Sequence, residues 1–231
     1  MTDIPIEAWL STAENHRIQS GRPHITLSWA QSMDGSISTR RGTALELSGP
    51  ESMRMTHRLR ASHDAIAVGI GTVLSDDPQL SVRLVEGTNP QPVVLDSHLA
   101  FPKQARWLEN TLPPWIAAVT PLDAHKVGYL ESRGARVLAH PADASGRVDL
   151  FAFLNTLAAC NINSLLVEGG AGLITSFLQY QLVDWVVVTI APLLVGGLNA
   201  LEGLLSPVPK LKEVDYTRLG KDLIVWGAPE W

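Results

Sequence analysis

The stretch that decides the fold is Ser164-Leu-Leu-Val-Glu-Gly-Gly-Ala-Gly-Leu-Ile-Thr-Ser176. An apolar run ends at the acidic residue Glu168, three glycines follow within four residues, and a helical pattern begins at once. This order predicts a β-strand that turns directly into a helix, with bare backbone N–H groups at the turn. Such a turn suits a phosphate group, and the carboxylate of Glu168 lies beside it. The stretch therefore predicts a nucleotide site with one polar side chain directed at a substrate.

Strands and helices alternate on both sides of this stretch. Strands are predicted at residues 24–31, 36–39, 64–68, 92–96, 115–120, 135–139, 164–167 and 184–191, and helices at 50–61, 123–132, 149–160 and 173–180. Ser48 and Glu51 have the spacing of a capping box at the first of these helices. Two final segments, 212–219 and 222–227, are joined by a Gly-Lys turn and predict a closing hairpin. The pattern predicts an α/β fold with a mostly parallel central sheet, a C-terminal antiparallel hairpin and helices on both faces.

Composition narrows the function classes. The chain has 231 residues, of which 45% are hydrophobic and 18% charged, as in ordinary globular proteins. A net charge of −5 argues against broad binding to nucleic acid or to anionic lipid. The single cysteine, Cys160, excludes an intrachain disulfide and a cysteine-based metal cluster, and its apolar neighbours predict a buried thiol.

Two segments bear on location and domain organisation. Residues 185–205 are apolar, but Pro192, Gly196, Gly197 and Glu202 interrupt them, so they predict a buried strand and a loop rather than a membrane span. Residues 1–22 are polar, without the apolar run of a secretory signal, and we expect a cytoplasmic protein. We interpret residues 1–22 as an N-terminal appendage with one helix over 6–18, and 23–231 as a single domain.

A second glycine turn, Gly69-Ile-Gly71, follows the predicted strand at 64–68. It has Leu74 where a dinucleotide fingerprint has its third glycine, so alone it is a weak signal and a structural turn explains it. Two such turns after two strands are more informative, because open α/β sheets bind ligands beyond the carboxyl ends of their strands.

Few side chains offer other chemistry. Arg60 and Arg83 form a phosphate clamp only if the fold brings them together, and the sequence leaves this open. No histidine pair has metal-ligand spacing, so no metal site is predicted. Asp76 is available for acid–base work, whereas Asp77 precedes a proline and is typical of a turn. No Gly-x-Ser-x-Gly elbow indicates covalent hydrolysis.

Taken in order, the motifs resemble a known family. They are Ala-Gln-Ser-Met-Asp-Gly at 30–35, Asp-Ala-Ile-Ala-Val-Gly at 64–69, the segment 72–80 followed by Arg83, Val-Leu-Asp-Ser at 94–97, Val-Glu-Gly-Gly at 167–170 and Ala-Pro-Leu-Leu-Val-Gly at 191–196. The chain resembles the reductase domain of bacterial riboflavin biosynthesis, which is the C-terminal domain of a bifunctional deaminase–reductase. The resemblance covers roughly residues 22–228 and implies a stand-alone reductase with a dihydrofolate-reductase-like three-layer fold.

The resemblance also implies an activity. NADPH is the expected hydride donor, because a bare polypeptide cannot supply a hydride. The expected substrate is 5-amino-6-(5-phosphoribosylamino)uracil, whose ribosyl group is reduced to ribityl by hydride transfer to C1′. The family members are homodimers, so we expect a homodimer as well, with no nucleic-acid or membrane partner.

Site residues follow from the resemblance position by position. Glu168 is the expected catalytic residue, which orients or protonates the reacting group and meets the polar head of the substrate. The expected substrate-binding residues are Arg60, Leu80, Arg83, Ala44 and Glu168. The expected cofactor-binding residues are Ala30, Gln31, Thr72, Asp76, Ser97, Gly169, Gly170, Ala171, Gly172, Leu173, Ile174, Thr175 and Ser176.

This chain departs from the family pattern on the substrate side. Ser28 stands where the family has a lysine, and Ala44 and Glu46 stand where it has a serine and a tryptophan. Loss of an ammonium and gain of a carboxylate make the pocket less favourable to an anion. Two alternatives therefore remain open: a reductase of the same fold with a different pyrimidine or pterin-like substrate, and a non-catalytic dinucleotide-binding relative.

Overall fold

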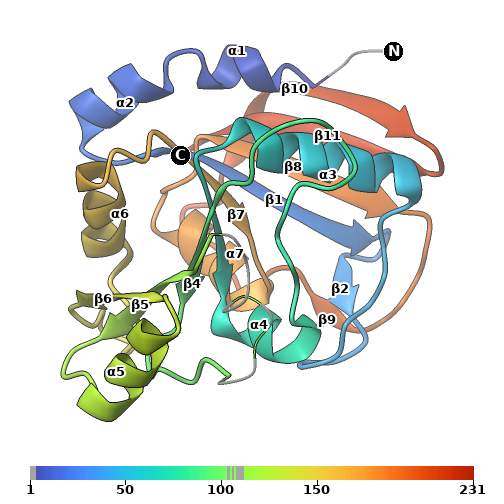
Figure 1. The fold of residues 1–231 in the computed structure, drawn as a ribbon. Coiled ribbons are helices and arrows are strands. Elements are labelled where there is room, and N and C mark those ends of the chain that lie inside the picture. The colour runs from blue at the N-terminus through green and yellow to red at the C-terminus, as the bar shows by residue number, and fades with distance from the viewer. Residues whose placement is uncertain (1–3, 103–104, 106, 108–111) are drawn as a thin grey trace.

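The computed structural model describes residues 4–102, 105, 107 and 112–231 and has the predicted α/β architecture (Figure 1). The helices are α1 (Ile6–Leu10), α2 (Ala13–Ser20), α3 (Pro50–Ser62), α4 (Ile70–Asp76), α5 (Ala124–Ser132), α6 (Leu150–Ala159) and α7 (Ala171–Gln179). The strands are β1 (His24–Ser32), β2 (Ser36–Ser38), β3 (Ala65–Gly69), β4 (Gln91–Leu95), β5 (Trp115–Val119), β6 (Arg136–His140), β7 (Ser164–Glu168), β8 (Trp185–Ala191), β9 (Leu198–Asn199), β10 (Lys210–Leu219) and β11 (Asp222–Glu230).

Nine strands form one sheet in the order β10-β11-β8-β1-β7-β3-β4-β5-β6. All neighbours from β8 to β6 pair in parallel, whereas β11 pairs antiparallel with both β8 and β10. The predicted parallel sheet with a C-terminal antiparallel hairpin is thus confirmed. β2 and β9 form a separate two-stranded ribbon.

The sheet is buried on both faces, which makes three layers. In β3, Ile66 and Val68 belong to a core cluster with Leu59 of α3 and Leu130 of α5. The alternate residues of β3, Ala65 and Ala67, belong to a second cluster with Phe153, Leu157, Ile174 and Phe177 of α6 and α7. Side chains alternate across a strand, so one strand serves both layers, and its residues are apolar throughout.

The N-terminal segment differs from the prediction. One helix was expected over 6–18, but α1 ends at Leu10 and α2 begins at Ala13. Ser11 lies between them and its Oγ donates to Ala8 O at 2.8 Å, a side-chain bond typical of helix ends. Trp9 of α1 is buried and stacks on Trp185 of β8 with 4.2 Å between ring centroids. The division into residues 1–22 and 23–231 stays a prediction.

The predicted start of α3 is confirmed, but the helix is not capped by the predicted Ser48–Glu51 capping box. Gly49 is the N-cap residue and Pro50 the first helical residue. The buried carboxylate of Asp222, at the start of β11, accepts from Gly49 N at 2.8 Å and from Ser52 Oγ at 2.6 Å. The local Ser48–Glu51 capping box is therefore replaced by a contact that ties the start of α3 to the C-terminal hairpin.

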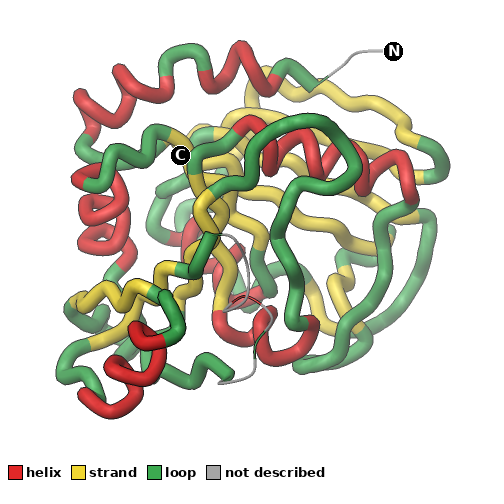
Figure 2. Tube along the Cα trace, in the orientation of Figure 1, coloured by secondary structure: helices red, strands yellow, loops and turns green. Residues whose placement is uncertain are grey.

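Two long loops lie on the same side of the molecule, one joining β2 to α3 and one joining β8 to β10 (Figure 2). Asp34, in the turn between β1 and β2, holds the second of these loops, because its carboxylate accepts from Val195 N at 3.0 Å and from Gly196 N at 2.6 Å. Hydrogen bonds, of which the one from Ser32 has the largest effect, hold the pKa of Asp34 well below its usual range.

None of the helices in the described part of the chain combines the length and apolarity needed to cross a lipid bilayer. Cys160, predicted to be buried, is partly exposed.

We expect Gly197→Ala to loosen this loop region. A Cβ at Gly197 would lie 2.1 Å from Ser38 O and 2.8 Å from Thr39 Cα, both backbone atoms, so the β2–β9 ribbon must separate. The free energy of unfolding should fall by about 2 kcal/mol, as measured by urea denaturation. Gly128→Ala is the control: in α5 no described atom lies within 4 Å of the added Cβ, so stability should rise by about 0.5–1 kcal/mol. Equal stability of Gly197→Ala and the unmodified protein would contradict this account.

Candidate active site

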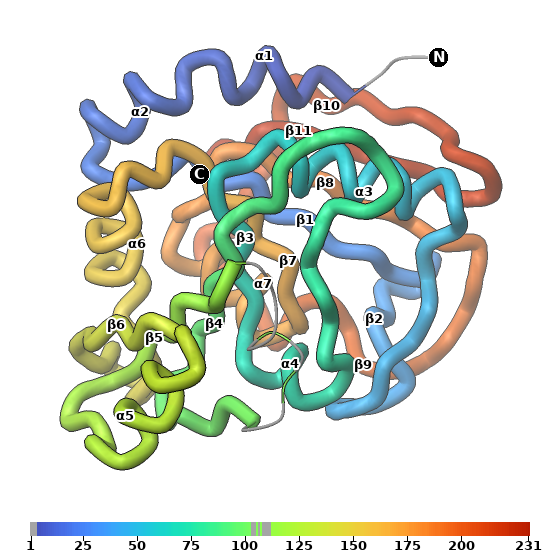
Figure 3. The backbone as a smooth tube through the Cα atoms, in the orientation of Figure 1, coloured from blue at the N-terminus to red at the C-terminus, as the bar shows by residue number. Residues whose placement is uncertain are grey.

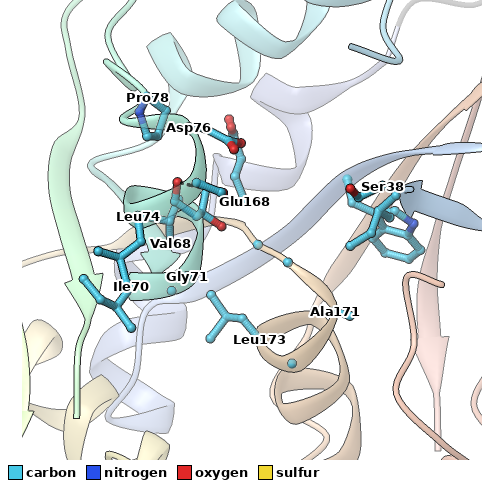
Figure 4. A pocket seen from close by; sticks show the side chains of 18 of the residues that line it. Ser38, Val68, Ile70, Gly71, Leu74, Asp76, Pro78, Glu168, Ala171 and Leu173 are labelled. Atoms are coloured by element: carbon cyan, nitrogen blue, oxygen red, sulfur yellow. Dashed lines mark hydrogen bonds between the residues drawn. The ribbon is translucent and has the colours of Figure 1, made fainter. Parts of the chain in front are cut away.

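A cavity of about 900 Å³ opens at the carboxyl ends of β1, β3, β4 and β7. Figure 4 shows Glu168 at the end of β7, Gly71 and Leu74 in α4, and Ala171 and Leu173 in α7, all around this space. Parallel pairing brings these strand ends to one edge of the sheet. In register, Ser28 of β1 lies opposite Glu168. The two glycine turns predicted from the sequence therefore face the same cavity.

The N-terminus of α7 is the part most suited to a phosphate. Gly170 is its N-cap residue, and no side chain of the described residues caps the helix. A Cβ at Gly169 would lie 2.9 Å from Leu173 Cβ, so glycine is needed where the chain enters the helix. A Cβ at Gly170 would lie 3.9 Å from Thr72 Oγ1, which shows how closely the α7 turn faces α4. Uncapped amides at a helix N-terminus attract anions.

The turn before α4 leaves open space beside its glycines, Gly69 and Gly71. Gly69 is the N-cap residue of α4 and Gly71 is its second residue. No described atom lies within 4 Å of a Cβ built on either glycine. Both residues line the cavity. A ligand can therefore approach the backbone closely here, which is the usual reason for glycine beside a dinucleotide.

The cavity also contains a buried ion pair at the end of β7. Arg60 of α3 donates from Nε to Glu168 Oε1 at 2.8 Å and from Nη2 to Oε2 at 2.7 Å. Both side chains are largely buried, with exposed fractions of 10% and 17%. Burial acts to lower the pKa of Arg60, but the charge and hydrogen bonds of Glu168 outweigh it, and the pKa is raised. Both oxygens of Glu168 accept from Arg60, so this side chain acts as a hydrogen-bond acceptor.

Most of the predicted site residues line this cavity. They are Ala30, Ala44, Arg60, Thr72, Asp76, Leu80, Ser97, Glu168, Gly169, Gly170, Ala171, Gly172, Leu173 and Ser176. Ser28 and Glu46, which replace family residues, line it too. Ser97 also accepts from Val148 N at 3.1 Å, so its hydroxyl fixes a neighbouring loop.

The remaining predicted residues lie outside the lining. Ile174 is fully buried in the core, and Thr175 accepts from Glu202 N at 2.8 Å, because these two positions of α7 face the protein interior. Gln31 accepts from Trp29 Nε1 at 2.8 Å. Arg83 is exposed, lies outside the cavity lining and donates to Ser81 Oγ at 2.7 Å, whereas Arg60 is held by Glu168. The Arg60–Arg83 phosphate clamp stays a prediction.

Sequence reasoning missed several polar residues of the cavity. Arg40, Arg41 and Arg147 line it, although they come from loops with no motif. Arg41 forms an ion pair with Glu202 of the β8–β10 loop. In the sequence only their positive charge distinguishes these three residues, and arginines on any protein surface carry the same charge. Within residues 4–102, 105, 107 and 112–231, no three His, Cys, Asp or Glu side chains are grouped to hold a metal.

Comparison with known proteins decides the family. The model of the RibD C-terminal domain matches residues 23–225. The chain belongs to the RibD C-terminal domain family. This match includes both glycine turns and the Arg60–Glu168 pair, and it stops just before the C-terminal residues of β11.

Individual members of the RibD C-terminal domain family agree with this. The 2,5-diamino-6-ribosylamino-4(3H)-pyrimidinone 5′-phosphate reductase of Methanothermobacter thermautotrophicus is 39% identical, over 88% of this chain and 97% of that protein. The structure of Acinetobacter baumannii RibD matches with 26% identity and a TM-score of 0.80, over 93% of this chain and 60% of that one. The chain thus spans a full-length reductase but only about 60% of this RibD. Enterococcus faecalis dihydrofolate reductase, at 13% identity and a TM-score of 0.50 over 89% of this chain and 96% of that one, shares the fold. The predicted dihydrofolate-reductase-like fold is confirmed.

Proposed function

We propose that this chain is the reductase of riboflavin biosynthesis, which converts the ribosyl group of a phosphorylated ribosylaminopyrimidine to ribityl. The observation that carries the proposal is that the Arg60–Glu168 fork and the uncapped glycine turn of α7 line the same cavity. Family membership and the reductase names of its relatives support the same reaction.

The residues present fit a nicotinamide dinucleotide. The diphosphate would lie on the amides of Gly170–Gly172, with Thr72 opposite, and the open space at Gly69 and Gly71 leaves room for the cofactor beside α4. When bound, the nicotinamide supplies the hydride. We infer NADPH rather than NADH, because three cavity arginines, Arg40, Arg41 and Arg147, favour an additional phosphate.

The chain's own residues would then orient the substrate. Glu168, fixed by Arg60, accepts hydrogen bonds from N–H or O–H groups of the ribosylaminopyrimidine. Part of the Arg60 guanidinium lines the cavity and offers positive charge to the ribose phosphate. Because both oxygens of Glu168 accept from Arg60, we assign it orientation of the reacting group rather than proton donation.

Two substrates fit the proposal. The sequence resemblance implies 5-amino-6-(5-phosphoribosylamino)uracil. The second candidate is 2,5-diamino-6-ribosylamino-4(3H)-pyrimidinone 5′-phosphate, which differs at one ring substituent, an amino group in place of an oxo group. It is favoured by the full-length match to the Methanothermobacter reductase, which carries that compound in its name.

The test mixes the purified protein with NADPH or NADH and with each aminopyrimidine phosphate in turn, and follows cofactor oxidation by absorbance. We expect oxidation with NADPH and at least one of the two phosphates, with a lower KM for NADPH than for NADH. Product identity is checked by mass, because reduction adds two hydrogens. Tight NADPH binding without turnover of either compound would favour the non-catalytic alternative or a different substrate.

We also propose a homodimer. Several large apolar side chains of the β8–β10 loop and the closing hairpin are exposed, among them Leu194, Leu204, Val208 and Tyr216. Clusters of exposed apolar residues are typical of subunit interfaces. Light scattering should give twice the mass of one chain.

A further inference from the structure

The segment between α4 and β4, residues 77–90, contains no helix or strand. It arches over α3 and returns to the sheet (Figure 3). Pro78 and Leu80 of this segment line the cavity near Glu168. The contact with α3 is close: a Cβ at Gly87 would lie 2.6 Å from Ala61 Cβ. This wall of the cavity therefore lacks strand pairing and depends on side chains for its position.

His57 of α3 provides the central attachment. Its Nδ1 accepts from Arg83 N at 2.9 Å and lies 3.4 Å from Leu84 N as a second, longer contact. The imidazole is 1% exposed. Arg60, one turn further along the same helix, adds a weaker contact from Nη1 to Ser81 O at 3.5 Å. Residues three apart lie on one helix face, so the same face of α3 holds both the segment and Glu168.

The surroundings of His57 keep it neutral. Burial is the main cause of its lowered pKa, about 4, and Arg60 and Arg83 add to it, whereas Glu168 acts in the opposite direction. With Nδ1 as acceptor, the ring proton is on Nε2. A protonated imidazole would present a donor to the two amides, and the contacts would be lost.

We propose that His57 is a positioning residue of the substrate end of the cavity, where its Nδ1 holds the amides of Arg83 and Leu84 and thereby sets the place of Leu80 and Ser81 beside the Arg60–Glu168 fork. The expected effect of His57 on substrate binding rests on the proposed function. The expected effect of His57 on the position of residues 77–90 is independent of that function. No motif in the sequence marks His57, because its partners are backbone amides 26 and 27 residues away.

A matched pair of variants tests the proposal. His57→Leu keeps most of the bulk and removes the acceptor. His57→Asn has the same number of side-chain atoms as leucine and places Oδ1 near the position of Nδ1. Amide hydrogen exchange of Arg83 and Leu84 should be slow in the unmodified protein and in His57→Asn, and at least tenfold faster in His57→Leu. This readout needs neither cofactor nor substrate.

Steady-state kinetics test the expected effect of His57 on substrate binding. In His57→Leu the KM for the aminopyrimidine phosphate should rise about tenfold, because the amides of Arg83 and Leu84 lose their acceptor and Leu80 and Ser81 are no longer held in place. In His57→Asn it should stay within about threefold, and the Kd for NADPH should be unchanged in both. Equal exchange rates or equal KM values in the two variants would overturn the proposal. If the unmodified protein reduces no aminopyrimidine phosphate, the proposed function fails, and the exchange rates alone decide the role of His57.

Discussion

Glu168→Gln is expected to lower turnover about 100-fold while changing the affinity for NADPH less than threefold. The amide replaces one carboxylate oxygen by an NH2 group, which cannot accept from either of the two Arg60 donors. Arg60 is then a buried cation without its counter-charge, and the acceptor offered to the substrate turns away. Steady-state kinetics and fluorescence titration with NADPH measure the two effects separately.

The control for this variant is Glu131→Gln, which makes the same chemical change on the exposed side of α5. It should leave both turnover and NADPH affinity unchanged. If Glu168→Gln weakens NADPH binding as much as it lowers turnover, Glu168 belongs to the cofactor side, and the assignment to the substrate is wrong.

A second large effect is expected from pH. His63 is 4% exposed, with Nδ1 2.6 Å from Leu59 O and Nε2 2.9 Å from Thr26 Oγ1, so both ring nitrogens are satisfied in the neutral form. Burial is the main cause that lowers its pKa from 6.5 to about 4. The unfolded chain therefore binds more protons between these values, and stability falls as the pH drops from about 6.5 to 4. His63 alone accounts for about 3 kcal/mol.

Other histidines act in the same direction, because burial also lowers the pKa of His16, His24, His57 and His140. Urea denaturation at several pH values measures the slope of the free energy of unfolding against pH. His63→Gln should reduce the slope between pH 6.5 and 4, whereas His125→Gln, at an exposed position of α5, should not. A free energy of unfolding that is constant over this range would contradict the burial of neutral histidines.

Much of the fold follows from local sequence. Helix starts at Asp123 and Asp149 were predicted, and both carboxylates cap their helices, accepting from His125 N and Ala152 N respectively. Parallel strands were evident because apolar runs alternate with helical patterns. The break between α1 and α2 and the cap of α3 were missed. The cap of α3 depends on Asp222, which is 173 residues from Gly49.

In the candidate site, too, some features follow from local sequence and others depend on contacts between distant residues. The glycine turns are local signals, and the structure brings them together as predicted. The pairing of Arg60 with Glu168 joins residues 108 apart, so the resemblance assigns both to the substrate but no local pattern predicts the fork. Arg83 was also assigned to the substrate, but its side chain lies outside the cavity lining, while the backbone of its segment is held by His57. Side-chain direction within a loop is set by such distant partners, which no local pattern contains.

The strand order has a consequence for the biogenesis of the protein. β1 lies between β7 and β8, although more than 130 residues separate it from either along the chain. On the ribosome, the first strand to emerge has both of its hydrogen-bonding edges open until the last third of the polypeptide is made. The nascent chain must therefore carry an unpaired apolar ribbon for most of its synthesis, and chaperones that shield such ribbons should raise the yield of active protein.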